Sequence, residues 1–266
     1  MLGSIKSSDP WQWSASGKHP AMKDFFNLGH DGPLVLGFSE WVKSGFQQAG
    51  SPKDSSSFHS WRFWAKGFKK ENLVCGIVKD SSDSLGRPYP ILIMGIGPLN
   101  GWEENWDLLP LACETTWNQM EYLSTRIFKG LKQMEEEVQN IQPPSSGWEE
   151  IAGQRENFKD GEATSASPQS TRRFRDWESQ ISQLTKEKEF FIHLDQEPLD
   201  QSTGISFWHF LFKKKGEVIP NALFMGGTLA KAFLAVFKRP LMPSDFVRLW
   251  SASSVELQTV TGKSEN

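Results

Sequence analysis

The stretch VCGIVKDSSDSLGRPYPILIMGIG, residues 74–97, decides how this chain can fold. Two short runs rich in isoleucine, valine and leucine, residues 73–78 and 91–96, flank a polar connector, residues 79–90. Apolar runs of this length, bounded by turn residues, predict buried strands. Because the connector is too long for a two-residue hairpin turn, we expect a loop with a defined shape of its own.

This connector combines residues that restrict the backbone with residues that can pair. Gly86 can adopt a positive φ, and Pro88 biases Arg87 towards an extended backbone. A carboxylate of the connector, Asp80 or Asp83, can then accept hydrogen bonds from loop amides and form a bidentate ion pair with Arg87. We therefore predict an ordered loop held by a structural ion pair. The alternative is that Asp80, Asp83 and Arg87 serve catalysis or bind an anion.

On either side of this strand pair the chain predicts further strands and helices. Residues 11–14 and 58–68 favour strands, and residues 33–49 favour a helix because their apolar positions recur at helical spacing. After the pair, apolar residues step by three or four from 109 to 141, which predicts one long helix. Pro110 fits the first turn of that helix.

The C-terminal half contains a break in pattern and then shorter elements. Residues 142–170 are rich in proline, serine and glycine, and predict a linker or surface insertion around a short helix. Residues 190–194 fit either a strand or a helix extension. The remaining predictions are helices at 171–188, 228–238 and 243–250, strands at 205–212 and 218–225 joined by a basic turn, and a polar tail from 251.

This order of elements indicates an α+β fold in which a largely antiparallel sheet is flanked by helices. It is compatible with a three-layer α/β/α sandwich, and a comparison with profilin or longin folds rests on analogy alone. We expect a single domain over residues 10–250, with a flexible linker or insertion near 142–170 and a polar tail at 251–266. Cys75 and Cys113 stand in apolar contexts, which predicts buried free thiols rather than a disulfide.

The composition narrows the classes of function. A net charge of −3 over 266 residues gives no bulk attraction to nucleic acid or to anionic membranes. No apolar run approaches the roughly 18 residues of a membrane span, and the N-terminus lacks the apolar core of a secretory signal. We therefore expect a cytoplasmic protein. The 12 tryptophans and 19 phenylalanines predict an aromatic core, with some exposed tryptophans as anchors for a protein partner.

Motifs for catalysis and cofactor binding give no specific signal. The spacing of Gly95, Gly97 and Gly101 is one residue longer than that of a dinucleotide loop, and Pro98 lacks an amide that phosphate would need. The five histidines show no metal-site spacing, and no GxSxG elbow, P-loop or HExxH motif occurs. We expect no catalytic residue, no metal and no cofactor.

Several short motifs, taken in order, resemble those of a known family. They are Gly17-Lys18-His19-Pro20 with Asp24-Phe25, Trp61-Arg62-Phe63, and Asp83-Ser84-Leu85-Gly86-Arg87 with Pro90. They are similar to motifs of the TagF family, also called ImpM, whose members are accessory proteins of the bacterial type VI secretion system. The resemblance covers residues 10–140. A late strand at 206–208 and a glycine turn before a helix at 226–233 match the family loosely.

The resemblance implies a non-enzymatic regulator that represses type VI secretion after translation. The implied partner is the forkhead-associated scaffold protein of that system, with neither nucleic acid nor membrane insertion involved. The residues expected to hold the two loops, or to contact the partner, are Gly17, Lys18, Asp24, Phe25, Trp61, Asp83, Gly86, Arg87 and Pro90. Two other hypotheses are a hydrolase-type enzyme with its site at the Asp83/Arg87 loop and a profilin- or longin-like adaptor.

Overall fold

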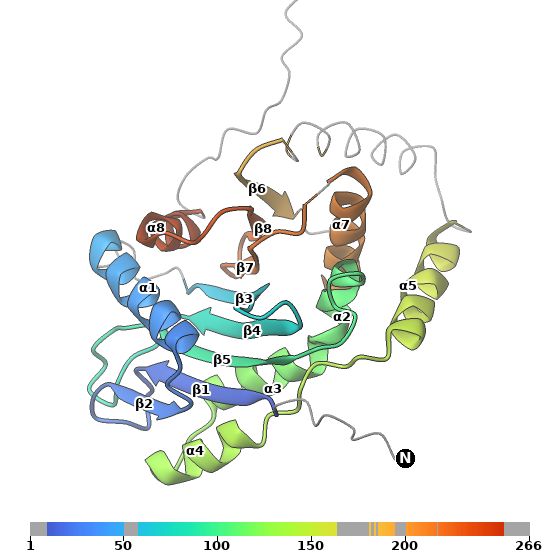
Figure 1. Ribbon diagram of the computed structural model, residues 1–266. Coiled ribbons are helices and arrows are strands. Elements are labelled where there is room, and N and C mark those ends of the chain that lie inside the picture. Colours follow the sequence, from blue (N-terminus) through green and yellow to red (C-terminus); the bar gives the residue numbers. More distant parts are fainter. Residues whose placement is uncertain are drawn as a thin grey trace, which may run out of the picture.

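The computed structural model describes residues 10–50, 58–163, 181, 184, 186–194, 201–216 and 218–252. Within these residues, one antiparallel sheet of eight strands runs in the order β2-β1-β5-β4-β3-β7-β8-β6 (Figure 1). The strands are β1 (Gln12–Gly17), β2 (Phe26–Gly29), β3 (Ser60–Lys66), β4 (Asn72–Lys79), β5 (Ile91–Pro98), β6 (Glu189–Leu194), β7 (Ala222–Gly227) and β8 (Ala232–Phe237). The α+β class and the antiparallel sheet are confirmed.

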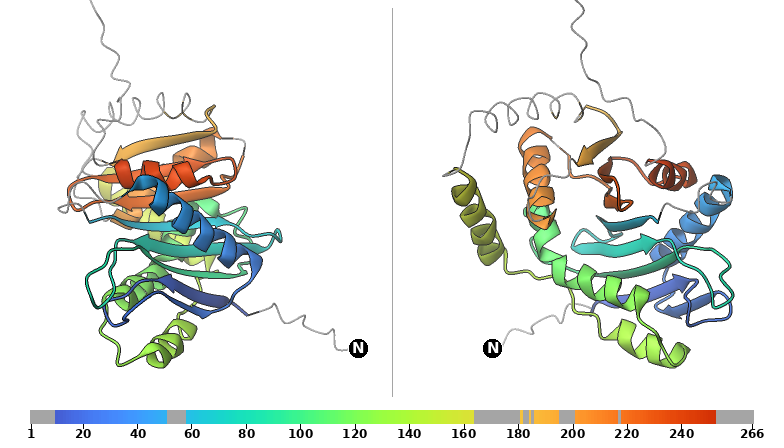
Figure 2. Two further views of the ribbon diagram at one scale, coloured as in Figure 1. Left: turned by 90° about the vertical axis from the view of Figure 1, so that its left-hand side faces the viewer. Right: turned by 180° about the vertical axis from the view of Figure 1, so that it is seen from behind.

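Helices cover both faces of this sheet, so the molecule has three layers (Figure 2). On one face lie α1 (Pro33–Ala49) and α8 (Pro243–Ser251), which also pack against each other. The other face carries η1 (Trp106–Leu108), α2 (Leu109–Ala112), α3 (Glu114–Thr125), α4 (Leu131–Gln139) and α7 (Gln201–Lys215), with α5 (Trp148–Ala163) outside them. The predicted helices at 33–49 and 243–250 are confirmed.

The central pair, β4 and β5, confirms the prediction from residues 74–97. The two strands pair along their whole length. Ile77 and Ile93 pack into the layer of α3, whereas Val78 and Leu92 pack into the layer of α1 and α8. Because successive side chains point to opposite faces and helices bury both faces, the two strands need apolar residues at nearly every position.

The crossing of α1 and α8 is so close that it admits only glycine at position 45. A Cβ on Gly45 would lie 2.3 Å from Cβ of Phe246. We expect Gly45→Ala to lower the free energy of unfolding by about 1–3 kcal/mol, because the helices must move apart. Gly37→Ala is the matched control, because an added Cβ there meets nothing within 4 Å. It should raise the free energy of unfolding by about 0.5–1 kcal/mol through helix propensity. Urea denaturation that gives both variants the same change would contradict the close crossing.

The single long helix predicted from 109 to 141 is wrong. The structure divides it into α2, α3 and α4, with a non-helical segment at 126–130. Ile127, which the periodicity places on the buried stripe, is exposed, and Phe128 is buried instead. The break redirects the chain, so that α4 packs across β1 and β2. Periodicity continues through the break because both helices bury an apolar face against the same sheet. Pro110 lies in the first turn of α2, as predicted.

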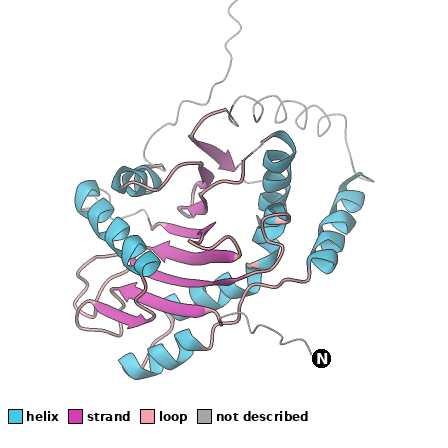
Figure 3. Cartoon of the chain, viewed as in Figure 1, coloured by secondary structure: helices cyan, strands magenta, loops and turns pink. Residues whose placement is uncertain are grey.

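Two predictions in the C-terminal part are also wrong. Residues 205–212 belong to helix α7 and not to a strand, and residues 228–237 form a turn and strand β8 and not a helix (Figure 3). β7 begins at Ala222, later than predicted. Short apolar runs that are buried on all sides carry no reliable period, so local pattern cannot separate helix from strand there. The loose family matches at 206–208 and 226–233 therefore lack the structures assumed for them.

The described tryptophans belong to the core, which confirms the predicted aromatic core, and none of those described is an exposed anchor. Eight of the described tryptophans are buried, and the other three, Trp11, Trp148 and Trp208, are partly buried. Trp177 lies outside the described residues, as does most of the helix predicted at 171–188. The undecided segment at 190–194 is part of strand β6. Cys75 and Cys113 are free and buried, as predicted.

The segment expected to be a linker contains helix α5, which includes the short helix predicted within it. Trp148 donates its indole N–H to the carbonyl of Asn100 at 2.8 Å, and Ile151 packs against Leu108 and Ala112. The first turn of α5 is therefore attached to the body of the protein. Residues 164–170 and the tail from 253 lie outside the described residues.

Candidate functional site

Two loops that carry the sequence motifs meet at one end of the sheet. The β1–β2 loop and the β4–β5 connector lie side by side there, at the left in Figure 1. The backbone amide of Ser84 donates to the carbonyl of Met22 at 2.8 Å, which joins one loop directly to the other. Residues some sixty positions apart in the sequence thus form a single surface.

The buried carboxylate of Asp83 holds these loops together. Its Oδ2 lies 3.0 Å from Nζ of Lys18 and accepts a hydrogen bond of 2.7 Å from Nε of Arg87. Its Oδ1 accepts hydrogen bonds of 3.0 Å from the amides of Leu85 and Arg87. Burial by itself would raise the pKa of Asp83, but the bonds from Lys18 and Arg87 outweigh it and hold that pKa well below its usual range. The carboxylate is therefore ionised, with both oxygens engaged.

Arg87 connects the loops from the solvent side. One terminal guanidinium nitrogen donates to the carbonyl of Lys23 at 2.8 Å and lies 3.8 Å from the carboxylate of Asp24. The predicted ion pair between Arg87 and a carboxylate of the connector is confirmed, and the carboxylate is that of Asp83. The pair is not bidentate, because Nε alone donates to Asp83 while the terminal nitrogen reaches the other loop. Half of the Arg87 side chain remains exposed.

Two glycines allow the loops to adopt this arrangement. Gly86 has a φ of +77°, as the sequence predicts for the residue before Arg87. Gly17 has a φ of +115°, and a Cβ there would lie 2.1 Å from the carbonyl oxygen of Pro90. Gly17, Gly86 and Pro90 are thus structural members of the motif, since they shape the loops that present other side chains.

The exposed part of this site is partly apolar. The Phe25 ring makes an edge contact with Tyr89 at 4.6 Å between centroids, and Nζ of Lys18 lies 4.8 Å from the centre of the Phe25 ring. Phe25 and Leu85 are nevertheless exposed. We call Asp24, Phe25, Leu85 and Arg87 the loop surface. It places two apolar side chains beside one acid and one guanidinium on a fixed backbone.

Trp61, also predicted as a site residue, lies apart from the loop surface. It is buried in the layer of α1 and α8, where its ring stacks on Phe233 at 6.5 Å. Its neighbour Arg62 points to the opposite face of the sheet, where it lines a pocket. Arg62 belongs to the motif Trp61-Arg62-Phe63 but was not among the residues predicted for the site. A lone charged residue between aromatic residues in a central strand was the signal that could have identified it.

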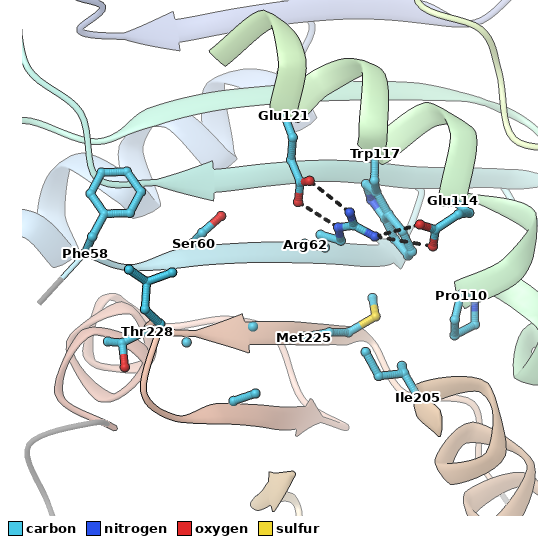
Figure 4. A pocket seen from close by; sticks show the side chains of 14 residues that line it. Phe58, Ser60, Arg62, Pro110, Glu114, Trp117, Glu121, Ile205, Met225 and Thr228 are labelled. Carbon is cyan, nitrogen blue, oxygen red and sulfur yellow. Dashed lines mark hydrogen bonds and ion pairs between the residues drawn. The ribbon is translucent and has the colours of Figure 1, made fainter. Parts of the chain in front are cut away.

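This pocket has a volume of about 480 Å³ and lies over β3, β7 and β8 beside α3 (Figure 4). Its depth comes from a row of small residues across three strands, because Ser60 pairs with Gly227 and Gly227 pairs with Ala232. Larger side chains, Trp117 and Met225, form its walls. At the open end, Phe58 and Leu229 are exposed.

Arg62 is held in the pocket by three residues of α3. Its Nε and one terminal nitrogen donate to Glu121 at 2.7 and 2.9 Å, and the same terminal nitrogen donates to Asn118 at 2.9 Å. The other terminal nitrogen lies 3.3 Å from both oxygens of Glu114. Burial by itself would lower the pKa of Arg62, but Glu121 and Glu114 outweigh it and raise that pKa. The guanidinium is charged, with an acceptor for each nitrogen.

The pocket and the loop surface share one end of the sheet. Asp80, at the start of the connector, accepts hydrogen bonds from the amide of His59 at 2.8 Å and from the indole of Trp250 at 2.7 Å. Nζ of Lys79 lies 5.2 Å from the centre of the Phe58 ring at the pocket rim. The connector that carries Asp83 is therefore anchored beside the pocket.

The described residues contain no group of three histidine, cysteine or acidic side chains that could hold a metal ion. In the same part of the chain, every helix is too short or too polar to cross a bilayer.

These features define a class of protein, an α+β domain whose two motif loops are joined by a buried ion pair. Residues 14–142 match the model of the TagF N-terminal domain, type VI secretion system-associated. The chain therefore contains a TagF N-terminal domain, which is a type VI secretion system-associated domain. The match spans β1 to α4 and includes both loops, whereas β7, β8 and α7 lie beyond it.

Among solved structures, the chain is similar to PA0076 from Pseudomonas aeruginosa PAO1. The two are 20% identical over 50% of this chain and 64% of PA0076, with a TM-score of 0.39. The matched region thus spans less than two thirds of PA0076, and the likeness carries no argument about function. No match to a curated protein was found.

Proposed function

We propose that this chain is a non-enzymatic cytoplasmic protein that represses type VI secretion after translation. In this proposal it binds the forkhead-associated scaffold protein of the system and so limits assembly. The observation that carries the proposal is the loop surface, which the TagF N-terminal domain contains in full. A backbone fixed by a buried ion pair loses little conformational entropy on binding, which favours recognition of a protein partner.

The geometry of Asp83 supports a binding role over the hydrolase alternative. A general base needs a free carboxylate oxygen directed at the proton it removes. Both oxygens of Asp83 are engaged by Lys18, Arg87 and loop amides, and the side chain is buried. Two of the three guanidinium nitrogens of Arg87, Nε and one terminal nitrogen, likewise donate to the two loops. The hypothesis of a profilin- or longin-like adaptor rests on the order of the secondary-structure elements, and none of the contacts described above favours it.

Leu85→Asp tests the proposed function. Leu85 is 72% exposed, so the change should leave folding intact while it adds a negative charge to the loop surface. We expect the affinity for the purified scaffold, measured by titration calorimetry, to fall at least about tenfold, as for a desolvated interface residue. Secretion of effectors should rise in cells that carry this variant as the sole copy.

Phe68→Asp is the matched control. Phe68 is 77% exposed and lies in the β3–β4 turn, at the opposite end of the sheet from the loop surface. It should bind the scaffold and repress secretion as the unchanged protein does. An unchanged protein that does not bind the scaffold, or equal losses in both variants, would refute the proposal.

A further inference from the structure

We call the pocket lined by Arg62, over β3, β7 and β8, the Arg62 pocket. Its charged side chains can accept hydrogen bonds from a ligand more readily than they can donate them. Among the described residues, its lining contains one cation, Arg62, and two carboxylates, Glu114 and Glu121. Each guanidinium nitrogen already has an acceptor on α3, so an incoming anion would have to displace an existing pair. A carboxylate can accept about four hydrogen bonds, and the bonds from Arg62 use two on Glu121. The pocket therefore favours a ligand that donates hydrogen bonds and carries positive charge.

Lys79 is a further cation that the charge of Glu121 affects, and it does not reverse this preference. Its ammonium lies against the Phe58 ring rather than in the lining of the pocket. Burial lowers the pKa of Lys79, and the charge of Glu121 opposes that change. Lys79 therefore offsets part of the negative charge of Glu121, but it is not among the residues that line the pocket.

The remaining lining suits an aliphatic stem that ends in the charged group. Trp117, Ile205 and Met225 form apolar walls, and Phe58 and Leu229 stand exposed at the entrance. An apolar stem that ends in a cationic, hydrogen-bond-donating group describes the side chain of lysine or arginine.

We infer that the pocket beside Arg62 receives a lysine or arginine side chain of the protein partner. This inference rests on the proposed function, since the side chain is taken to belong to the scaffold that contacts the adjacent loop surface. The pocket combines Arg62, Glu114 and Glu121 of the TagF N-terminal domain with Ile205, Met225 and Leu229 from beyond it. The part of the chain outside the family domain thereby helps to select the partner.

A titration with blocked tripeptides tests the charge preference of the pocket. The probes are acetyl-Leu-Lys-Leu-amide and its counterpart with glutamate at the centre, added to protein labelled with ¹³C at the methionine methyl groups. The lysine peptide should shift the Met225 resonance saturably and leave that of Met134, which is buried between α4 and the sheet, unchanged. Added salt should weaken the binding. A lysine peptide that does not shift Met225, or a glutamate peptide that shifts it equally, would overturn the inference.

Three variants assign the effect to the pocket. Glu121→Gln should weaken lysine-peptide binding at least fivefold, and Ala232→Leu should abolish it by filling the cavity without altering charge. Glu40→Gln, an exposed change on α1 at the opposite face, should leave binding unchanged. Thermal unfolding of each variant establishes that it is folded. If Glu121→Gln and Glu40→Gln bind the peptide equally, the assignment is wrong.

Scaffold binding separates this inference from the proposed function. If the scaffold binds and Leu85→Asp weakens it, while Glu121→Gln and Ala232→Leu have no effect, the pocket inference fails and the proposed function stands. If the unchanged protein does not bind the scaffold at all, the proposed function fails, and with it the identity of the partner.

Discussion

Asp83→Ala is expected to lower the melting temperature by on the order of 10 °C, since removal of one partner from a buried ion pair is strongly destabilising. The substitution leaves the buried ammonium of Lys18 beside Arg87 with no carboxylate between them. It also removes the acceptor for the amides of Leu85 and Arg87. Differential scanning calorimetry measures the change directly.

Asp24→Ala is the matched control for this prediction. Its carboxylate lies 3.8 Å from the same guanidinium but is largely exposed, so its loss should change the melting temperature by no more than about 2 °C. The double variant Lys18→Met/Asp83→Leu removes both buried charges and should recover part of the loss. Equal melting temperatures for Asp83→Ala and Asp24→Ala would show that the buried pair does not hold the loops.

Acidification from pH 6.5 to pH 4 is expected to remove roughly 3 kcal/mol from the free energy of unfolding through His209. His209 is fully buried, and its ring accepts from the indole N–H of Trp64 at 3.1 Å and donates to the carbonyl of Ile205 at 2.8 Å. Both ring nitrogens are thus used by one neutral tautomer. Burial lowers the pKa of His209 to about 4.

Because the pKa of His209 is lowered in the folded state, the stability of the protein falls as the pH falls. A histidine with a lowered pKa in the folded state binds its proton more readily after unfolding. The stability that it contributes to the folded state is therefore fully present above about pH 6.5. That contribution is lost as the pH falls towards 4. The pKa of His19 is also lowered by burial and acts in the same direction. Asp83 and Asp107, whose pKa values are lowered, lose their contributions only below about pH 4.

Urea denaturation at several pH values between 7 and 4 checks this prediction. His209→Gln cannot titrate, so its unfolding free energy should depend much less on pH over this range, whatever its value at neutral pH. His193→Gln, an exposed change on strand β6, should keep the dependence of the unchanged protein. If His209→Gln keeps the full pH dependence of the unfolding free energy, groups other than His209 cause that dependence.

The site was predictable from the sequence to the extent that its members lie close along the chain. Asp83, Gly86 and Arg87 occupy one turn of the connector, where the need for a positive φ and the reach of the guanidinium are local properties. That Lys18 completes the ion pair was not derivable from spacing, because it depends on the position of β1 beside β5. The motif resemblance brought Lys18 into the candidate set without giving it this role.

The Arg62 pocket shows what local pattern leaves out. Ser60, Gly227 and Ala232 form its small-residue row only because β3, β7 and β8 are neighbours in the sheet. Glu114 and Glu121 reach Arg62 because α3 packs on β4 and β5, next to β3. No sequence window contains all of these elements, so the pocket emerges only in the folded chain.

By itself, the sequence determined the strand pair around the connector, the helices at 33–49 and 243–250, the antiparallel α+β class and the ordered Asp83–Arg87 loop. Each of these follows from interactions between residues near one another in the chain. The tertiary structure alone decided that residues 205–212 are helical, that β8 is a strand and that the predicted long helix breaks at 126–130. The physical reason is that apolar segments buried on all sides gain similar free energy in either conformation, so the elements packed against them make the choice.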